Sequence, residues 1–275
     1  MNHLLSTKSL KPATIKRKIK CIKSLVKHGV DISNPDKVVA FINTVTCASG
    51  TKAIAIDSYR DYLNMLGFQE IKLPHIKREE KLPFIPLESE IDAMINATRR
   101  KMSTFLQLLK ETATRPIEAW SLKWINVDIP NRNVTITPAK FSKPRRLKIS
   151  EYLLNRMLSL HRRSNYIFSP TGDSTRFAEE IEHFARNLLK QRARVAEKLG
   201  NPRIKQISLR TFRHWKATME YAKTKDLLHV KEMLGHVNIQ NTLKYVHIAN
   251  AIIQISGSFT CKVANNVEEA SRLVE

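Results

Sequence analysis

The chain has 275 residues, and its 47 Lys and Arg against 25 Asp and Glu give a formal net charge of +22. A hydrophobic content of 42% is enough to build packed cores, which excludes a wholly disordered polycation, and the length suits one or two domains. A charge of this size repels itself unless a polyanion neutralises it, so nucleic acid is the expected partner, ahead of an anionic membrane surface.

The first predicted element is an amphipathic helix within Met1–Val30, a segment with eight basic residues and no acidic one. Its apolar residues recur at helical spacing: Ile15, Ile19, Ile22 and Val26. Because no acid balances the bases, we expect the polar face to meet phosphate, although a solvated surface helix is the alternative. The expected backbone contacts are Lys11, Lys16, Arg17 and Lys20.

Two more helical patterns follow, at residues 37–43 and 51–66. The second of them can place five apolar or aromatic residues on one broad face: Ile54, Tyr59, Tyr62, Leu63 and Leu66. Three prolines then fall within residues 71–86, and proline restricts its own backbone and that of its predecessor. We therefore predict a helical domain over residues 1–72, a linker over 73–86 and a second domain over 87–275.

The second domain is predicted to be mainly α with a small antiparallel β-sheet. Its patterns are helical at residues 87–100, 103–110 and 115–124, again at 151–161 and 176–199, and from 211 almost to the end with an interruption near Gly235. Between the two groups, residues 133–137 and 146–149 alternate apolar and polar side chains, which predicts a short hairpin. Five of the nine residues from 140 to 148 are basic, so the hairpin tip is cationic.

The first residues suited to phosphate chemistry are Arg115 and the lysines of the hairpin tip. A guanidinium offers parallel donors to two phosphate oxygens, although an arginine at such a place is more often a surface or ion-paired residue, here paired with Glu118 three residues later. Lys140, on a turn among other cations, could donate a proton to a leaving oxygen, or it could only grip the backbone together with Lys143, Arg145 and Arg146.

Two later segments add to this set. Arg210 and Arg213 are three residues apart on one predicted helix, where two cations repel unless an anion lies between them. Gly235 can end one helix and Asn238 can cap the next, which puts Tyr245 two turns into that next helix. Taken alone, Tyr245 would more often be a packing residue than a nucleophile.

Several other classes of protein lose support from the sequence. The odd set of three cysteines without a CxxC pair argues against a disulfide framework and a cysteine-rich zinc site. None of the seven glycines belongs to a Gly-Lys or G-x-G arrangement, so we expect no nucleotide cofactor and no metal. No apolar run approaches about 18 residues and the N-terminal segment lacks an apolar signal core, so we expect a cytoplasmic protein without a membrane segment.

The order of the four segments resembles the tyrosine recombinase (phage integrase) family. That family carries Arg, Lys, His-x-x-Arg, His or Trp, and Tyr in this order, and the run from Arg213 to Tyr245 with its Leu-Gly-His is the most specific part. Residues 1–69 resemble the family's helical core-binding domain. The sequence RHWKAT at 213–218 is most similar to integrases of archaeal plasmids and viruses, and less so to bacterial Xer recombinases.

The resemblance implies a reaction and a set of roles. Tyr245 would attack the scissile phosphate to form a 3′-phosphotyrosyl intermediate, without ATP or metal, and cations around it would lower its pKa. The cations and histidine at the phosphate would be Arg115, Arg210, Arg213 and His236. Lys140 would protonate the 5′-oxygen, with Lys143 as the other candidate. The implied partner is a double-stranded DNA recombination site, bound by a homo-oligomer that is a tetramer on DNA, with the tail from 249 to 275 packing on a neighbouring protomer.

The chain also departs from the family pattern. Arg210 stands where most members have histidine, and an always-protonated arginine cannot accept the tyrosine proton, so the sequence leaves the general base unassigned. His214, next to Arg213, is expected to point elsewhere and to be structural. Three rival functions stay open: a type IB topoisomerase-like strand cutter, a catalytically impaired DNA-binding protein of the same fold, and a basic RNA-binding or ribosomal protein.

Overall fold

The computed structural model describes residues 10, 12–79, 82–139 and 142–250. The chain divides into two compact units, Met1–Lys81 and Leu82–Glu275, each with its own core. The division falls inside the stretch that the prolines mark as a linker.

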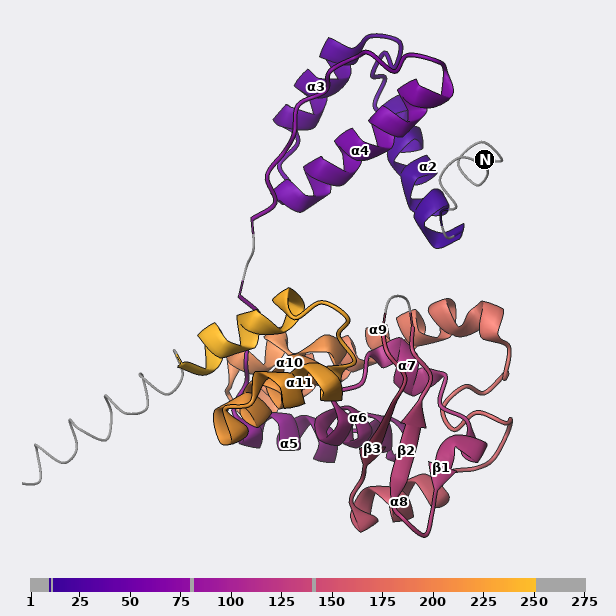
Figure 1. Ribbon diagram of the computed structural model, residues 1–275, viewed down its shortest axis with the longest axis vertical. Helices are drawn as coiled ribbons and strands as arrows, with labels where there is room; N and C mark the ends of the chain where they lie inside the picture. Colours follow the sequence, from indigo (N-terminus) through magenta and orange to yellow (C-terminus); the bar gives the residue numbers. More distant parts are fainter. Residues whose placement is uncertain (1–9, 11, 80–81, 140–141, 251–275) are drawn as a thin grey trace, which may run out of the picture. The chain divides into compact units, whose positions relative to one another are not determined.

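The first unit consists of three helices in the described residues. They are α2 (Pro12–Lys27), α3 (Pro35–Thr44) and α4 (Ser49–Met65), and both α2 and α3 pack on α4 (Figure 1). Asn34 caps α3 by accepting from the backbone N–H groups of Asp36 and Lys37. Tyr59, fully buried among the apolar residues, donates to the carbonyl of Ile32 at 2.9 Å, so the core of this unit also fixes the loop before α3.

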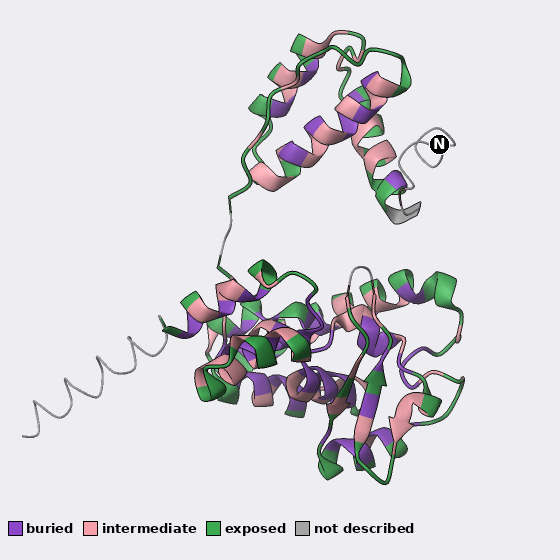
Figure 2. Ribbon diagram, viewed as in Figure 1, coloured by how far each residue is buried: buried purple, intermediate pink, exposed green. Residues whose placement is uncertain are grey.

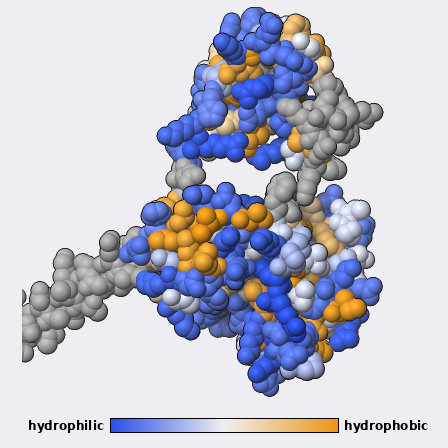
Figure 3. Space-filling model, in the orientation of Figure 1, coloured by the Kyte–Doolittle hydropathy of each residue, from blue (hydrophilic) through white to orange (hydrophobic). Residues whose placement is uncertain are grey.

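Two apolar residues expected in this core lie outside it. Val26 is 54% exposed, and Leu25 is buried instead. Leu25 lies about one helical turn after Ile22 and about three turns after Ile15, so these three residues share the face of α2 that is turned to the core. Leu66 is 50% exposed, because α4 ends at Met65 and the chain leaves the core there. Figure 2 shows which parts of these helices are exposed. Figure 3 shows that the surface of this unit is mostly hydrophilic in the same view.

The second unit is mainly helical with a small antiparallel sheet, as predicted. Its helices and strands are α5 (Glu88–Asn96), α6 (Arg100–Thr112), α7 (Pro116–Trp120), η1 (Trp124–Asn126), β1 (Val127–Asp128), β2 (Asn133–Ile136), β3 (Arg145–Lys148), α8 (Glu151–Leu158), η2 (Ser174–Arg176), α9 (Phe177–Lys198), η3 (Pro202–Gln206), α10 (Leu209–Thr224) and α11 (Leu227–Leu234). A further helical stretch covers residues 240–250. The strand order is β1-β2-β3, and Val134 pairs with Leu147 across the hairpin. The short β1 was not predicted, because two residues are too few to show an alternating pattern.

The core of the second unit is built around α6. Phe105 of α6 meets Trp120, Phe168 and Phe184 edge-to-face, with ring centroids 4.9 to 5.6 Å apart. Helix α6 also packs against α10, and α10 packs against α11, so the residues just after α6 are brought next to α10 and α11. This packing is what places Arg115 and Arg213, far apart in sequence, in one region.

The segment after α10 contains one more break than predicted. Lys225 adopts a left-handed conformation with φ of 55°, and Asp226 then caps α11 through the N–H groups of Leu228 and His229. Gly235, with φ of 67°, ends α11 as expected, and Asn238 caps the next helix by accepting from the N–H of Gln240. The predicted protomer-contacting tail lies outside the described residues from 251 onward. Among the described helices none is long and apolar enough to cross a membrane.

Candidate active site

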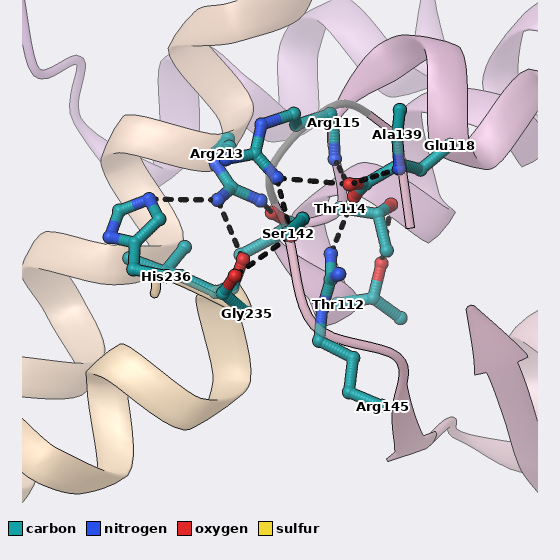
Figure 4. Close-up of polar contacts among 12 residues, drawn as sticks. Thr112, Thr114, Arg115, Glu118, Ala139, Ser142, Arg145, Arg213, Gly235 and His236 are labelled. Carbon is teal, nitrogen blue, oxygen red and sulfur yellow. Dashed lines mark hydrogen bonds and ion pairs between the residues drawn. The ribbon is translucent and has the colours of Figure 1, made fainter. Parts of the chain in front are cut away.

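A cleft of about 800 Å³ in the second unit is lined by residues from five stretches of the chain: 115–117, 139, 181–185, 208–214 and 236–245. It brings together five of the six residues that the sequence nominates for catalysis: Arg115, Arg210, Arg213, His236 and Tyr245. The sixth, Lys140, lies outside the described residues. Figure 4 shows the polar contacts that hold Arg115, Arg213 and His236 in place.

Arg115 occupies the N-cap position of α7 and is held by a buried acid. Its Nη1 donates to Glu118 Oε1 at 2.9 Å and to Ser142 Oγ at 2.7 Å, while its backbone N–H donates to Glu118 Oε2 at 3.0 Å. The ion pair with Glu118, one of the two sequence interpretations, is therefore present. It does not exclude the other, because Arg115 keeps 28% of its side chain exposed and lines the cleft.

The buried carboxylate of Glu118 forms ion pairs with two arginines, Arg115 and Arg145. Burial alone would favour its neutral form, but hydrogen bonds from Arg145 and Arg115 outweigh burial and lower the pKa of this carboxyl. Arg145 donates to it at 2.6 Å with a side chain only 6% exposed, so this arginine, predicted as a DNA-backbone contact, has its side chain inside the protein. The neighbouring Arg146 and Lys143 are exposed, and Arg146 pairs with Asp128.

Arg213 links the segments that form the cleft. Its Nη1 donates to the carbonyl of Ala113 at 2.6 Å, and its Nη2 donates to the carbonyl of Leu234 at 2.8 Å and to Nε2 of His236 at 3.1 Å. Burial, reinforced by the positive charge of Arg115, lowers the pKa of Arg213 to about 10, which still leaves it charged at neutral pH. Arg210 lies about one turn earlier on α10 and is exposed. Both arginines line the cleft, Arg213 from the protein interior and Arg210 from the surface.

His236 is held as a neutral imidazole. Burial and the charge of Arg213 lower its pKa to about 3. Because Arg213 can only donate, Nε2 of His236 must accept, and Nδ1 must carry the proton that it shares with Thr242 Oγ1 at 2.9 Å. In this arrangement His236 orients Arg213 and adds no positive charge of its own.

Tyr245 lies in the residue 240–250 helix and is 1% exposed. Burial raises the pKa of its hydroxyl to about 12, and the opposing effects of Arg213 and Arg115 are smaller. The predicted lowering of the tyrosine pKa is therefore wrong for the protein without DNA, because desolvation of the phenolate outweighs the attraction of the cations.

His214 is the residue that the sequence interpretation misjudged. Its Nδ1 lies 3.0 Å from the hydroxyl of Tyr245, so it points toward the candidate nucleophile and not elsewhere. The sequence places His214 one step after Arg213 on the same helix, about 100° around its axis. His214 contacts Tyr245 because the residue 240–250 helix packs beside α10, and the sequence alone does not show this packing. Ser142 was missed for a similar reason, since it reaches Gly235 and Arg115 across the fold.

The DNA-contact candidates of the first unit are on the surface. Lys16, Arg17 and Lys20 of α2 are exposed, while Lys11 lies outside the described residues. Lys18 of the same helix is instead paired with the buried Asp61 at 2.5 Å. No group of three or more His, Cys, Asp or Glu suited to a metal ion occurs in the part of the chain that the structure describes.

Residues 87–251 match the model of the phage integrase family, which is more than half of the chain. The chain therefore belongs to that family. It is similar to the tyrosine recombinase XerC of Staphylococcus aureus, with 27% identity over 195 residues that cover 66% of this chain and 62% of the relative. The chain thus spans less than two thirds of the length of the curated relatives it matches.

Solved structures of integrases and recombinases share the fold. The Tn1549 transposon integrase in complex with circular intermediate DNA matches with a TM-score of 0.67 and 14% identity, over 89% of this chain and 92% of that one. The lambda integrase tetramer bound to a Holliday junction matches with a TM-score of 0.65 and 11% identity, over 88% and 74%. At these identities the likeness shows the fold alone.

Proposed function

We propose that the protein is a site-specific DNA recombinase that cuts and rejoins strands through a 3′-phosphotyrosyl intermediate. The observation that carries the proposal is the convergence of Arg115, Arg213, His236 and Tyr245 on one cleft from three separate segments of the sequence, of which the last supplies both His236 and Tyr245. Membership of the phage integrase family supports the same reaction class. A non-enzymatic basic protein has no need to bring a buried tyrosine and two arginines together.

The arrangement divides the chemistry among the residues. The Tyr245 oxygen forms a bond to the scissile phosphorus, and the 5′-oxygen of the next nucleotide leaves. Arg115 and Arg213, with Arg210 at the rim, stabilise charge on the non-bridging oxygens, and Lys140 or Lys143 protonates the leaving oxygen. Because the intermediate keeps the phosphodiester energy, a free 5′-hydroxyl can reverse the step without a cofactor.

The substrate and the assembly are part of the same proposal. Exposed cations on α2 and at the hairpin suit double-stranded DNA, and the net charge of +22 fits a phosphate partner. We propose that the active form is a tetramer on a pair of recombination sites, acting on DNA in the cytoplasm. The closer kinship with integrases of archaeal plasmids and viruses rests on the RHWKAT sequence, and the core-binding role of residues 1–72 rests on the family resemblance.

A suicide substrate tests the reaction. The protein is incubated with a pool of duplexes that carry a nick near randomised flanks, so that cleavage releases a short fragment and traps the enzyme on DNA. Denaturing electrophoresis should show a protein–DNA adduct with the wild type and none with Tyr245→Phe. Sequencing of the trapped strand then gives the preferred site.

The outcomes separate the alternatives. An adduct with Tyr245→Phe would remove the nucleophile assignment, and no adduct with the wild type would support a catalytically impaired DNA-binding protein. Relaxation of supercoiled DNA without exchange between two trapped sites would favour a topoisomerase-like activity.

A further inference from the structure

The general base is the open question in this site, because Arg210 cannot take a proton. The described residues near the Tyr245 hydroxyl include one side chain that can. His214 lies on α10 with its Nδ1 at 3.0 Å from that hydroxyl, and the two rings are 5.9 Å apart between centroids. His236, the other histidine of the cleft, has both nitrogens engaged with Arg213 and Thr242.

We propose that His214 is a catalytic residue that orients the Tyr245 hydroxyl and accepts its proton during attack on the phosphate. The inference rests on the proposed recombinase function. The step is balanced: the bond from Tyr245 oxygen to phosphorus forms, the hydroxyl proton moves to Nδ1 of His214, the bond from phosphorus to the 5′-oxygen breaks, and the lysine of the hairpin gives that oxygen a proton. In the rejoining step His214 returns the proton to Tyr245.

The surroundings of His214 keep it in the form that can accept. Burial, followed by the charges of Lys244, Arg213 and Arg210, lowers its pKa to about 4, so the ring is neutral at physiological pH. The neutral ring can carry its proton on Nε2, which leaves Nδ1 free to accept the hydrogen bond from the tyrosine O–H. The charged groups around it come from both packed elements, with Arg210 and Arg213 on α10 and Lys244 on the residue 240–250 helix.

Binding of DNA would strengthen this base. The same cations that lower the pKa of His214 line the cleft where the phosphate would bind. A phosphodiester anion there offsets their charge, which favours the imidazolium and so raises the basicity of His214 when the substrate is in place. The pKa values of Tyr245 and His214 are therefore far apart in the protein without DNA and closer together when DNA is bound. This difference disfavours transfer of the tyrosine proton before the substrate is in place.

The test uses full-length protein and the nicked duplex recovered from the suicide-substrate selection, under single-turnover conditions from pH 6 to pH 9. Four proteins are compared: the wild type, His214→Asn, His214→Ala and His161→Gln. Asparagine can place its amide oxygen near the position of Nδ1, so it can keep the hydrogen bond but cannot accept a proton. His161 is an exposed histidine that does not line this cleft, so it provides a matched control.

The rate of the wild type and of His161→Gln should level off above the pKa that His214 has in the DNA complex, because the imidazole is then neutral and can accept the proton. His214→Asn should bind the duplex with wild-type affinity and cleave about 10²- to 10⁴-fold more slowly, the usual contribution of a general base. Its rate should rise about tenfold per pH unit, because only the ionised tyrosine can then attack. Added imidazole should restore part of the rate to His214→Ala.

The inference fails if His214→Asn cleaves at the wild-type rate. It also fails if His214→Asn is slow but keeps the pH profile of the wild type and imidazole does not rescue His214→Ala. That second result would mean that His214 only supports the structure. If the wild type forms no adduct while His161→Gln and wild type bind DNA equally, the proposed function itself fails, and the inference with it. If the wild type forms the adduct, a negative result with His214 leaves the recombinase assignment intact.

Discussion

Removing the charge of Glu118 should destabilise the second unit far more than an ordinary surface substitution. Glu118 has a fully buried side chain and accepts hydrogen bonds from Arg145, Arg115 and the backbone N–H of Ala139. Glu118→Gln keeps the shape but leaves the guanidinium of Arg145, 6% exposed, without a counter-charge. Breaking one side of a buried pair costs about 3–5 kcal/mol, and we expect a value near the lower end because Arg115 reaches solvent.

Urea denaturation followed by tryptophan fluorescence measures this loss. Trp120, Trp124 and Trp215 are the only tryptophans in the sequence and all lie in the second unit, so their emission reports on that unit alone. The matched control is Glu151→Gln, which changes the same group in an exposed pair with Arg132 at 3.5 Å and should cost less than about 1 kcal/mol.

A double variant separates the charge from the shape. Glu118→Gln combined with Arg145→Met removes both members of the buried pair, so it should be more stable than Glu118→Gln alone. A Glu118→Gln protein within about 1 kcal/mol of the wild type would refute the reasoning, since that is the size of a surface ion pair. So would a double variant less stable than the single one, because then Arg145 would not be the residue left unpaired.

Three further predictions use the same assay. Ala113→Gly should change stability by less than about 1 kcal/mol, because the left-handed φ of 52° costs a residue with a Cβ about 1–2 kcal/mol, while glycine loses the buried methyl group and more backbone freedom on folding; a loss above about 2 kcal/mol would contradict this. Gly235→Ala should destabilise it by about 2 kcal/mol or more, because φ is 67° and a Cβ would lie 2.8 Å from Ser142 Oγ and Arg145 Nη1; a neutral result would mean that the hairpin moves away freely. Stability should also fall as the pH drops from 6.5 toward 3, because the unfolded chain then binds a proton that the folded His236, with a pKa of about 3, does not; in His236→Gln this part of the slope should be absent, and an unchanged slope would contradict it.

Much of the fold could be read from local patterns. Helical periodicity and the two alternating segments predicted a mainly helical unit with one hairpin. This works because the residues that an amphipathic helix or a half-buried strand turns to the core are apolar and recur at the period of that element. Gly235 and Asn238 marked a helix end and a helix start through their own conformational preferences. The break at Lys225 was missed because a lysine in the left-handed region has no such signature, although Asp226 supplied a cap signal.

The site was readable only in part, for a physical reason. Arg115, Arg213 and Tyr245 could be nominated because their order matches a known family. Which of their neighbours face them depends on how distant helices pack. His214 contacts Tyr245 and Arg145 is buried on Glu118 because of tertiary packing, and residue spacing along one helix or strand does not contain that information. The pKa of Tyr245 was misjudged in the same way, because cations can be counted in a sequence and burial cannot.

The double role of Arg213 decides which variants can dissect the mechanism. This side chain is 6% exposed and its guanidinium joins the end of α6 to the end of α11 through the carbonyls of Ala113 and Leu234. A substitution by a residue without a side-chain donor leaves two buried carbonyls unsatisfied, each costing about 1–3 kcal/mol, and removes the hydrogen bond to His236 as well. Loss of cleavage in an Arg213 variant would therefore mix lost phosphate binding with a displaced cleft. The hydrogen bond between Tyr245 and His214 does not involve the Arg213 guanidinium, so conservative variants of these two residues report on the chemistry with the contacts of Arg213 in place.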